Sequence, residues 1–261
     1  MRTELVSEPG DRNRPNEDFA SVGLPASGQG GSVVVLDGVT PPRDGGGCLH
    51  SVPWFTARLG GALTELTVSL PDVPLTELLA RAVARTAEAH AGTCDLSHPR
   101  TPQATVAVVR WSADSVDHLV LCDAAVLLGG VSGEVTPVLD DRLARVPREL
   151  LVSAEVCDAR ARNKEGGFWT AAADPSVADR AVTGSVPRAS VARLAALSDG
   201  VTRWTETFRE GDWTDLFAYV AGKGARAVVD RVRELERADE ARALLGRGKR
   251  HDDATAVYVE L

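Results

Sequence analysis

The stretch 32–38 reads SVVVLDG, an apolar β-branched run that ends at the turn dipeptide Asp37-Gly38. Such a run predicts a short buried strand, and the Asp-Gly pair predicts where it ends. At the other end of the chain, residues 254–261 read ATAVYVEL, whose alternation predicts a final strand. This strand directly follows a second acidic dipeptide, Asp252-Asp253. Two distant strands are therefore expected to carry carboxylates at their ends.

The pattern between these stretches predicts a mixture of helices and strands. Helices are predicted over residues 53–70, 75–90, 213–221 and 225–242. Strands are predicted over residues 104–111, 118–122, 125–128 and 190–197, the first three as an antiparallel meander. Another strand is expected to begin at Phe19. This order of elements favours an α+β fold with antiparallel sheets over a doubly wound parallel sheet.

Composition and charge place the chain among soluble globular proteins. It has 261 residues, 44% hydrophobic and 25% charged, which fits a single domain over 1–261. Its 29 Lys+Arg against 37 Asp+Glu give a net charge of −8, which disfavours nucleic acid and anionic membrane surfaces as partners. We expect no signal peptide and no membrane span. Four cysteines without a CxxC pair predict reduced thiols and a cytoplasmic location.

Acidic residues recur where the predicted strands begin or end. They are Glu17-Asp18, Asp37, Asp123, Asp199 and Asp252-Asp253. Any one of them alone is typical of a turn. If the strand ends converge, each like-charged pair about 4 Å apart costs on the order of 4 kcal/mol at an effective dielectric constant of about 20. Such a cluster must bind protons or cations, and all-oxygen ligands favour Mg²⁺ or Mn²⁺.

Six segments occur in an order that resembles the PP2C (PPM) family of metal-dependent protein phosphatases. They are RPNED (14–18), VVVLDG (33–38), TPQATVAVV (101–109), LCDAAVLL (121–128), LAALSDG (194–200) and HDDATAVYV (251–259). The resemblance spans residues 12–261. It implies a four-layer α-β-β-α sandwich, in which helices flank two antiparallel sheets and metal ions lie at one edge between the sheets.

The resemblance also implies a role for each matching residue. Asp37 would bridge two metal ions, and the Gly38 carbonyl would help to ligate one of them. Glu17 would bind the second ion, and Asp18 would orient its waters. The remaining implied ligands are Asp199 and Asp252 for the first ion, and Asp123 with Asp199 for a third ion.

The implied activity is hydrolysis of phosphoserine or phosphothreonine monoesters in a phosphorylated protein or peptide. Two or three Mg²⁺ or Mn²⁺ ions would lower the pKa of a bridging water from about 15.7 towards about 7, and the resulting hydroxide would attack phosphorus in line. No obligate partner is implied. The alternative is a pseudophosphatase, a regulatory binding module with little turnover. A Mg²⁺-dependent nuclease is disfavoured by the net charge of −8.

The expected phosphate-binding arginine is displaced. The family places it four residues before the glutamate, where this chain has Asn13 between Arg12 and Arg14. Either arginine could donate two parallel hydrogen bonds to a phosphate group, and we favour Arg14. The alternative is that both are solvated loop charges. A histidine that follows Asp-Gly in some members is Val39 here, for which His50 is a candidate replacement.

Other departures concern loops. An insertion, PPRD (41–44), precedes three glycines, and the turn expected to read GDSR reads CDAA (122–125). Asp253 stands at the usual asparagine position. A variable segment that resembles the family's flap is predicted over about 163–187. Its Phe168 and Trp169 could contact substrate, although packing is the preferred role for Trp169.

Cysteine and histidine residues form a separate candidate site. Cys48-x-His50 and His90-x₃-Cys94-x₃-His98 contain plausible zinc ligands. His90 and Cys94 would share a helix face if the preceding helix continued, but a glycine at position 92 predicts that it stops. Because the sequence lacks paired short spacings, buried thiols with nearby loop histidines are the preferred interpretation.

Overall fold

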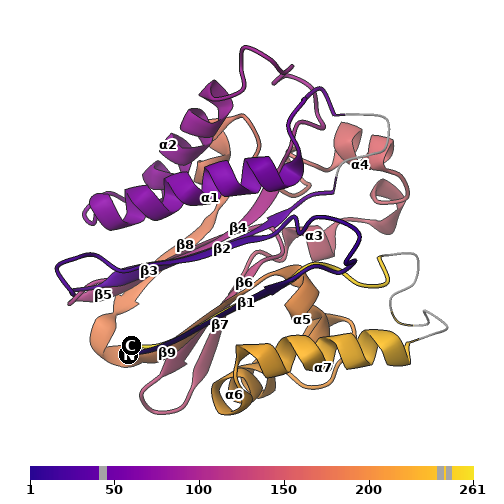
Figure 1. Cartoon of the computed structure of the whole chain (residues 1–261). Coiled ribbons are helices and arrows are strands. Elements are labelled where there is room, and N and C mark those ends of the chain that lie inside the picture. Colours follow the sequence, from indigo (N-terminus) through magenta and orange to yellow (C-terminus); the bar gives the residue numbers. More distant parts are fainter. Residues whose placement is uncertain (41–45, 240–243, 245–248) are drawn as a thin grey trace.

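The computed structural model describes residues 1–40, 46–239, 244 and 249–261. Within this part of the chain, two five-stranded sheets stack face to face, and helices cover the outer face of each (Figure 1). Every pair of neighbouring strands among the described residues is antiparallel. The predicted α+β fold with layers α-β-β-α is therefore confirmed. None of the described helices is both long and apolar enough to cross a membrane.

Each sheet combines strands from distant parts of the sequence. One sheet has the order β1 (Arg2–Glu8), β10 (Ala254–Glu260), β9 (Val191–Leu197), β6 (Ala125–Gly130), β7 (Val135–Leu139). The other has the order β2 (Phe19–Gly23), β3 (Gly31–Gly38), β4 (Ala104–Trp111), β5 (Ser115–Leu121), β8 (Val182–Pro187). The first and last strands of the chain are thus neighbours.

Helices cover the outer face of each sheet, and short helices lie in the segments that connect the strands. On the second sheet lie α1 (Val52–Ser69) and α2 (Leu75–Glu88). On the first sheet lie α5 (Asp199–Glu206), α6 (Trp213–Lys223) and α7 (Ala225–Ala238). Between β7 and β8 lie α3 (Arg142–Arg145), α4 (Ala154–Arg160) and 3₁₀ turns over Arg148–Leu150 and Pro175–Arg180, and a third 3₁₀ turn, Arg188–Ser190, joins β8 to β9.

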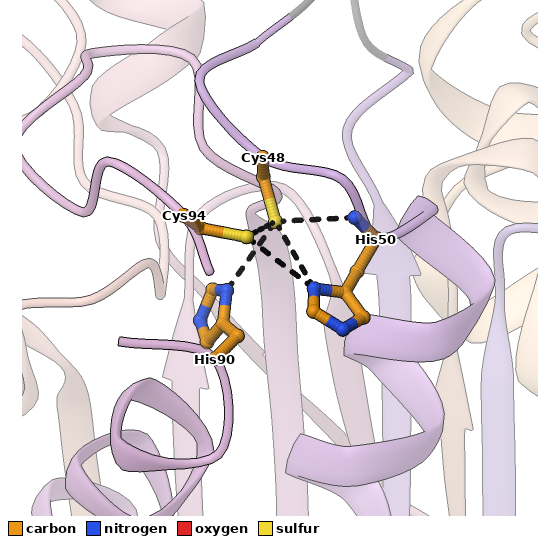
Figure 2. Close-up of side chains that lie close together, drawn as sticks. All are labelled: Cys48, His50, His90 and Cys94. Atoms are coloured by element: carbon orange, nitrogen blue, oxygen red, sulfur yellow. Dashed lines mark hydrogen bonds between the residues drawn. The ribbon is translucent and has the colours of Figure 1, made fainter. Parts of the chain in front are cut away.

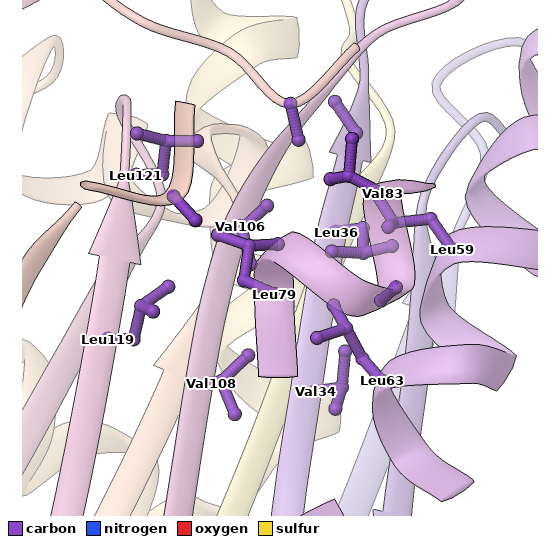
Figure 3. Packing of buried hydrophobic residues seen from close by; sticks show 14 of the residues in the cluster. Val34, Leu36, Leu59, Leu63, Leu79, Val83, Val106, Val108, Leu119 and Leu121 are labelled. Carbon is purple, nitrogen blue, oxygen red and sulfur yellow. The ribbon is translucent and has the colours of Figure 1, made fainter. Parts of the chain in front are cut away.

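Strand β3 is buried on both faces, which explains why its sequence is apolar without alternation. Val34 and Leu36 pack against buried residues of α1 and α2 (Figure 3). Val33 and Val35 face the opposite way and pack between the two sheets. A further apolar cluster lies between the first sheet and helices α5, α6 and α7. These layers fix the strand ends from which the acidic residues project.

The predicted meander is wrong at its third strand. Strand β4 pairs with β5, but β6 pairs with β7 and β9 in the other sheet. Between β5 and β6, Cys122 adopts a φ of 68°, which is uncommon for a residue other than glycine. The backbone N–H of Cys122 donates to Asp140 Oδ2 at 2.8 Å. The chain therefore crosses between the sheets at the turn that contains Asp123.

Most other predicted elements agree with the structure within two residues at each end. Helix α7, however, ends at Ala238, and the predicted end at Arg242 lies outside the described residues, as does the insertion 41–44. Helix α5 and strands β1 and β7 were not predicted. Residues Ser198-Asp199-Gly200 are a helix start and not only a turn.

The segment 163–187 is not one irregular flap, because β8 occupies its last six residues and pairs with β5. Phe168 is buried in a small apolar cluster that also contains Cys122, the residue at the crossing between the sheets. Trp169 packs against the core under α1 and α2, and the Arg180 guanidinium lies 4.7 Å from the centre of its ring. Both aromatic residues therefore serve packing.

Candidate metal and phosphate site

Acids from five distant positions come together where strands begin or end. Asp37 is the penultimate residue of β3, Asp18 immediately precedes β2, and Asp199 opens α5 directly after β9. Asp252 lies two residues before β10, and Asp123 lies in the crossing between β5 and β6. The charges of Asp199, Asp18 and Asp252 all act on the buried Asp37 carboxyl. Asp199 also acts on Asp123.

Burial and crowding disfavour the charged form of these carboxyls. Burial is the main cause that raises the pKa of Asp37 well above its ordinary value, followed by the charges of Asp199 and Asp18. Burial, and to a lesser extent the Asp199 charge, raises the pKa of Asp18 to about 7. The same two causes raise the pKa of Asp123 to about 7. The charged cluster therefore needs protons or cations near neutral pH.

Two carboxylate oxygens of the cluster fit a bound cation. They are Asp18 Oδ1 and Asp199 Oδ1, which are buried and have no hydrogen-bond partner among the described residues. A buried carboxylate oxygen without a partner is costly, and a divalent cation with a preference for oxygen ligands would satisfy it. The residues present therefore fit Mg²⁺ or Mn²⁺.

Glu17 lies beside the end of β3. A Cβ atom at Gly38 would come within 2.6 Å of the Glu17 carbonyl oxygen, so this close approach requires glycine. Thr40 Oγ1 donates a hydrogen bond to the Glu17 carboxylate. The backbone N–H groups of Glu17 and Gly10 donate to the two oxygens of Asp253 at 2.7 and 2.8 Å. Asp253, at the position where the family has asparagine, thus holds Glu17 near β10.

Asp18 is held in place by β10 and the end of β9. Thr255 Oγ1 donates to Asp18 Oδ2 at 2.6 Å. The backbone N–H of Thr255 in turn donates to Ser198 Oγ at 2.9 Å, and Ser7 Oγ lies 2.8 Å from Thr255 Oγ1. One oxygen of Asp18 is therefore fixed by a hydroxyl network, and the other faces the acidic cluster.

Two cationic side chains at the site were not predicted. Lys249 Nζ lies 2.6 Å from Asp252 Oδ1, and Arg203 Nη2 lies 2.7 Å from Asp252 Oδ2. Burial lowers the pKa of Lys249, but the charge of Asp252 and a hydrogen bond to it outweigh burial, so that the net shift is upward. Both oxygens of Asp252 are therefore engaged by cations of the chain itself.

Glu206 is an acidic neighbour that the sequence analysis missed. It lies seven residues after Asp199, two turns along α5, and Thr202 Oγ1 donates to it at 2.8 Å. Desolvation of the carboxyl, and secondarily the charge of Asp199, raises the pKa of Glu206, although the residue is still exposed at the surface. It also acts electrostatically on Asp123. The i, i+7 spacing would have indicated this position, had a helix been predicted after Ser198.

A pocket of about 780 Å³ opens beside the acids. Its lining combines acidic and basic side chains; the charged members are Asp11, Arg12, Arg14, Glu17, Lys249, Arg250, Asp252 and Asp253, with His251 beside them. Arg12 and Arg14 are both exposed here, whereas Asn13 hydrogen bonds to Asp11 through its backbone and side chain. His50 is not among the residues that line this pocket, so the structure does not place it as a replacement for the missing histidine.

The acidic cluster predicts how stability depends on pH. We expect the Tm of the metal-free protein to fall as the pH rises from about 5 to about 8. The pKa of Asp18 and of Asp123 is 3.8 in the unfolded chain and about 7 in the folded protein. At a pH between these two pKa values, the folded protein therefore binds more protons at these carboxyls than the unfolded chain does. Their contribution to stability is therefore present at low pH and lost as the pH rises through about 7.

Thermal unfolding in EDTA, followed by circular dichroism, measures this dependence. Mn²⁺ should raise the Tm more at about pH 8 than at about pH 5, because the carboxylates that bind it are then ionised. Asp18→Asn should make the metal-free Tm depend less on pH, because it removes one of the two carboxyls that cause the dependence. A metal-free Tm that rises between these two pH values would contradict the prediction.

Comparison with known proteins supports the fold. No protein-family model matches the chain, and no curated protein matches its sequence. Serine/threonine phosphatase Stp1 from Staphylococcus aureus superposes with a TM-score of 0.58 at 13% identity, over 100% of this chain and 95% of that one. The Mycobacterium tuberculosis serine/threonine phosphatase PstP/Ppp gives 0.60 at 19% identity, over 100% and 98%.

A third match is the catalytic domain of the serine/threonine protein phosphatase PstP in complex with two manganese ions. It superposes with a TM-score of 0.59 at 20% identity, over 99% of this chain and 97% of that one. The chain therefore has the fold of the PP2C-type serine/threonine phosphatases, as the order of its motifs predicted.

Proposed function

We propose that this chain is a metal-dependent phosphatase that hydrolyses phosphoserine and phosphothreonine monoesters in proteins or peptides. The observation that carries the proposal is the cluster around Asp37 and Asp199, which holds unpartnered carboxylate oxygens next to a pocket with basic side chains. The fold shared with serine/threonine phosphatases supports the same activity. A net charge of −8 disfavours nucleic acid and an anionic membrane surface as substrates.

Each acid would hold an ion in the way that the family resemblance implies. Asp37 would contact two Mg²⁺ or Mn²⁺ ions, with Glu17 on one of them and the Gly38 carbonyl as a further ligand. Asp199 and Asp252 would complete the other. Asp123, beside Asp199, offers a third position. When bound, such ions lower the pKa of coordinated water and offset charge on a phosphoryl group.

The protein's own side chains would position the substrate and water. Arg14 and Arg12 line the pocket, where a guanidinium can donate two parallel hydrogen bonds to phosphoryl oxygens. Asp18, fixed by Thr255, presents its second oxygen to the cluster and can accept a hydrogen bond from water there. A pocket of about 780 Å³ with charged lining residues has room for a phosphorylated side chain.

Turnover assays test the proposal. The full chain with Mn²⁺ should hydrolyse p-nitrophenyl phosphate and release phosphate from phosphoserine and phosphothreonine peptides, and EDTA should abolish both reactions. Folded, Mn²⁺-binding protein that hydrolyses no phosphoester would contradict the proposal. Cleavage of DNA at low salt, under the same conditions, would indicate a nuclease instead.

A second candidate function is a pseudophosphatase, a binding module with little turnover. One observation favours it: Lys249 and Arg203 engage both oxygens of Asp252. These two cations compete with a metal ion for that carboxylate. Titration of the protein with Mn²⁺ by calorimetry, alongside the turnover assays, separates the two functions, because a pseudophosphatase would bind its ligand or metal without hydrolysis.

Substitution of the pocket arginines should separate their contributions. We expect Arg14→Ala to lower kcat/KM for p-nitrophenyl phosphate by about tenfold or more, because it removes a charge-assisted hydrogen bond worth about 1.5–3 kcal/mol. Arg12→Ala should have a smaller effect. Steady-state kinetics at saturating Mn²⁺ measure both, and Arg209→Ala, which changes an exposed arginine outside the pocket lining, is the control. If the double variant Arg12→Ala/Arg14→Ala keeps the wild-type kcat/KM, both arginines are solvated loop charges without a role in phosphate binding.

A further inference from the structure

Four potential metal ligands meet at a second place, which shares no residue with the acidic site. Cys48 and His50 lie just before α1, while His90 and Cys94 follow the end of α2. Figure 2 shows their side chains pointing toward a common centre. One ligand atom from each lies within 4.8 Å of all the others. Two short pairs, Cys-x-His and His-x₃-Cys, are therefore brought together across 39 intervening residues (51–89).

The distances resemble those between the ligands of a tetrahedral zinc ion. Zn–S bonds of about 2.3 Å and Zn–N bonds of about 2.0–2.1 Å place neighbouring ligand atoms about 3.3–3.8 Å apart. Cys48 Sγ lies 3.3 Å from His90 Nδ1 and 3.6 Å from His50 Nδ1. Cys94 Sγ lies 3.3 Å from His50 Nδ1. The two sulfurs are 2.8 Å apart, so an ion would move them apart by about 1 Å.

Hydrogen bonding alone does not explain why these side chains meet. His90 is only 2% exposed, and its Nε2 has no partner among the described residues. Its Nδ1 faces the Cys48 sulfur, which is a weak hydrogen-bond partner. Burying an imidazole with such poor partners is unfavourable. A metal ion would replace this weak contact with a coordinate bond.

The surroundings support both sulfurs and both rings. The backbone N–H of Leu49 donates to Cys94 Sγ at 3.3 Å, and that of His50 donates to Cys48 Sγ at 3.4 Å. Such hydrogen bonds stabilise the negative charge of metal-bound thiolates. The His50 ring stacks on Trp54 with centroids 3.9 Å apart, and His90 meets the same indole edge-on at 5.4 Å. These contacts orient both rings and both sulfurs toward the common centre.

We propose that Cys48, His50, His90 and Cys94 bind one Zn²⁺ ion as a structural site. Two sulfur and two nitrogen ligands select zinc over the Mg²⁺ or Mn²⁺ that suit the carboxylates. Four protein ligands leave no open position for a substrate, which is typical of a structural site and not of a catalytic one. This zinc site replaces the interpretation preferred from the sequence, in which the residues are buried thiols with nearby loop histidines.

The zinc ion would fasten the segment that leaves β3 to the end of α2. The two segments already touch, because the backbone N–H of Asp95 donates to Gly47 O at 2.8 Å. His98, the fifth candidate, is not in the ligand group, and its Nδ1 accepts the backbone N–H of Arg100 at 3.1 Å. The site does not depend on the proposed phosphatase activity, because none of its ligands lines the pocket beside the acids.

Metal analysis of the full chain tests the site. Protein purified under reducing conditions should contain about one zinc ion per chain, as measured by inductively coupled plasma mass spectrometry. Cys94→Ser and His50→Ala should lose most of this zinc and unfold at a lower temperature. Cys157→Ser and His98→Gln are the matched controls, since they change a cysteine and a histidine outside the group and should retain the zinc.

One further variant separates this site from the acidic one. Asp37→Asn should retain the zinc ion even if it loses Mn²⁺ binding and turnover. Zinc that is lost in Asp37→Asn but kept in Cys94→Ser would place the ion among the carboxylates and overturn the proposal. A Cys48–Cys94 disulfide in the wild-type protein, or folded wild-type protein that takes up no zinc, would overturn it as well.

Spectroscopy of the wild-type protein decides the matter even if the ligand variants fail to fold. X-ray absorption at the zinc edge should show two sulfur neighbours at about 2.3 Å and two nitrogen neighbours at about 2.0–2.1 Å. Replacement of zinc by Co²⁺ should give thiolate-to-cobalt charge-transfer bands and the intense visible bands of a tetrahedral ion. A shell of oxygen and nitrogen without sulfur would contradict the site.

Discussion

Asp37→Ala is expected to lower kcat for p-nitrophenyl phosphate by about 10³-fold or more at saturating Mn²⁺. Metal ions at a phosphoryl-transfer site contribute several kcal/mol of transition-state stabilisation, and each 1.4 kcal/mol is about a factor of ten in rate. Asp37 is the carboxyl on which the charges of Asp18, Asp199 and Asp252 act together. Its removal should therefore disturb every ion held by the cluster.

The same substitution should stabilise the metal-free protein. The Asp37 carboxyl is buried among like charges, so its removal relieves repulsion that no metal ion offsets in EDTA. We expect a higher Tm without metal and a much smaller increase of Tm on addition of Mn²⁺. This opposite effect on stability and turnover distinguishes loss of a functional carboxylate from a general loss of structure, which would lower both.

Steady-state kinetics and thermal unfolding with and without Mn²⁺ measure the two effects. Asp141→Ala is the control, because that aspartate is exposed and forms a surface ion pair with Arg145. It should leave turnover and the Mn²⁺ effect unchanged. Activity of Asp37→Ala close to that of the wild type would exclude the acidic cluster as the catalytic site. An inactive wild type whose Mn²⁺ effect on Tm is lost in Asp37→Ala would favour the pseudophosphatase.

The elements that could be predicted are those whose sequence pattern is set by local burial. Strand β3 lies between two apolar layers, so its residues are apolar on both faces, and this is visible in SVVVL. Helices α1 and α2 show an apolar face because each covers one side of a sheet. The crossing from β5 to β6 was missed because its polar turn resembles a hairpin turn, and the positive φ of Cys122 leaves no mark in the sequence.

The acids of the candidate site were predictable, but their partners were not. Acids at strand ends recur in a visible pattern, and the order of motifs resembles a known family. Lys249 and Arg203 reach Asp252 through the tertiary fold, and no spacing in the sequence indicates this contact. The Cys-His group was discounted because its sequence lacks the paired short spacings of specific zinc motifs. Its two halves lie near the start of α1 and the end of α2, and the tertiary fold brings them together.

Glu236→Ala is expected to destabilise the protein by about 3–5 kcal/mol, because it removes a fully buried carboxylate that pairs with two arginines. Glu236 is fully buried on α7. Its Oε1 pairs with Arg203 at 2.8 Å, and its Oε2 pairs with Arg233 at 2.8 Å and with His251 Nδ1 at 2.7 Å. One carboxylate therefore joins α5, α7 and the segment that leads into β10.

Chemical denaturation with guanidinium chloride measures the loss of stability. Glu234→Ala is a matched control two residues away, since that glutamate is exposed and its ion pair with Arg231 lies at the surface. It should change the free energy of unfolding by less than about 1 kcal/mol. Similar effects of the two substitutions would show that the buried network contributes no more than a surface ion pair.

The Glu236 network should also affect the acidic site, because Arg203 bridges Glu236 and Asp252. Without Glu236, Asp252 becomes the remaining carboxylate partner of Arg203 among the described residues, so Arg203 competes more strongly with a metal ion for it. We therefore expect Glu236→Ala to require a higher Mn²⁺ concentration for half-maximal turnover, and Arg203→Met combined with Glu236→Ala to reverse this shift. A lower stability with an unchanged Mn²⁺ requirement would show that Arg203 supports the fold without influencing the site.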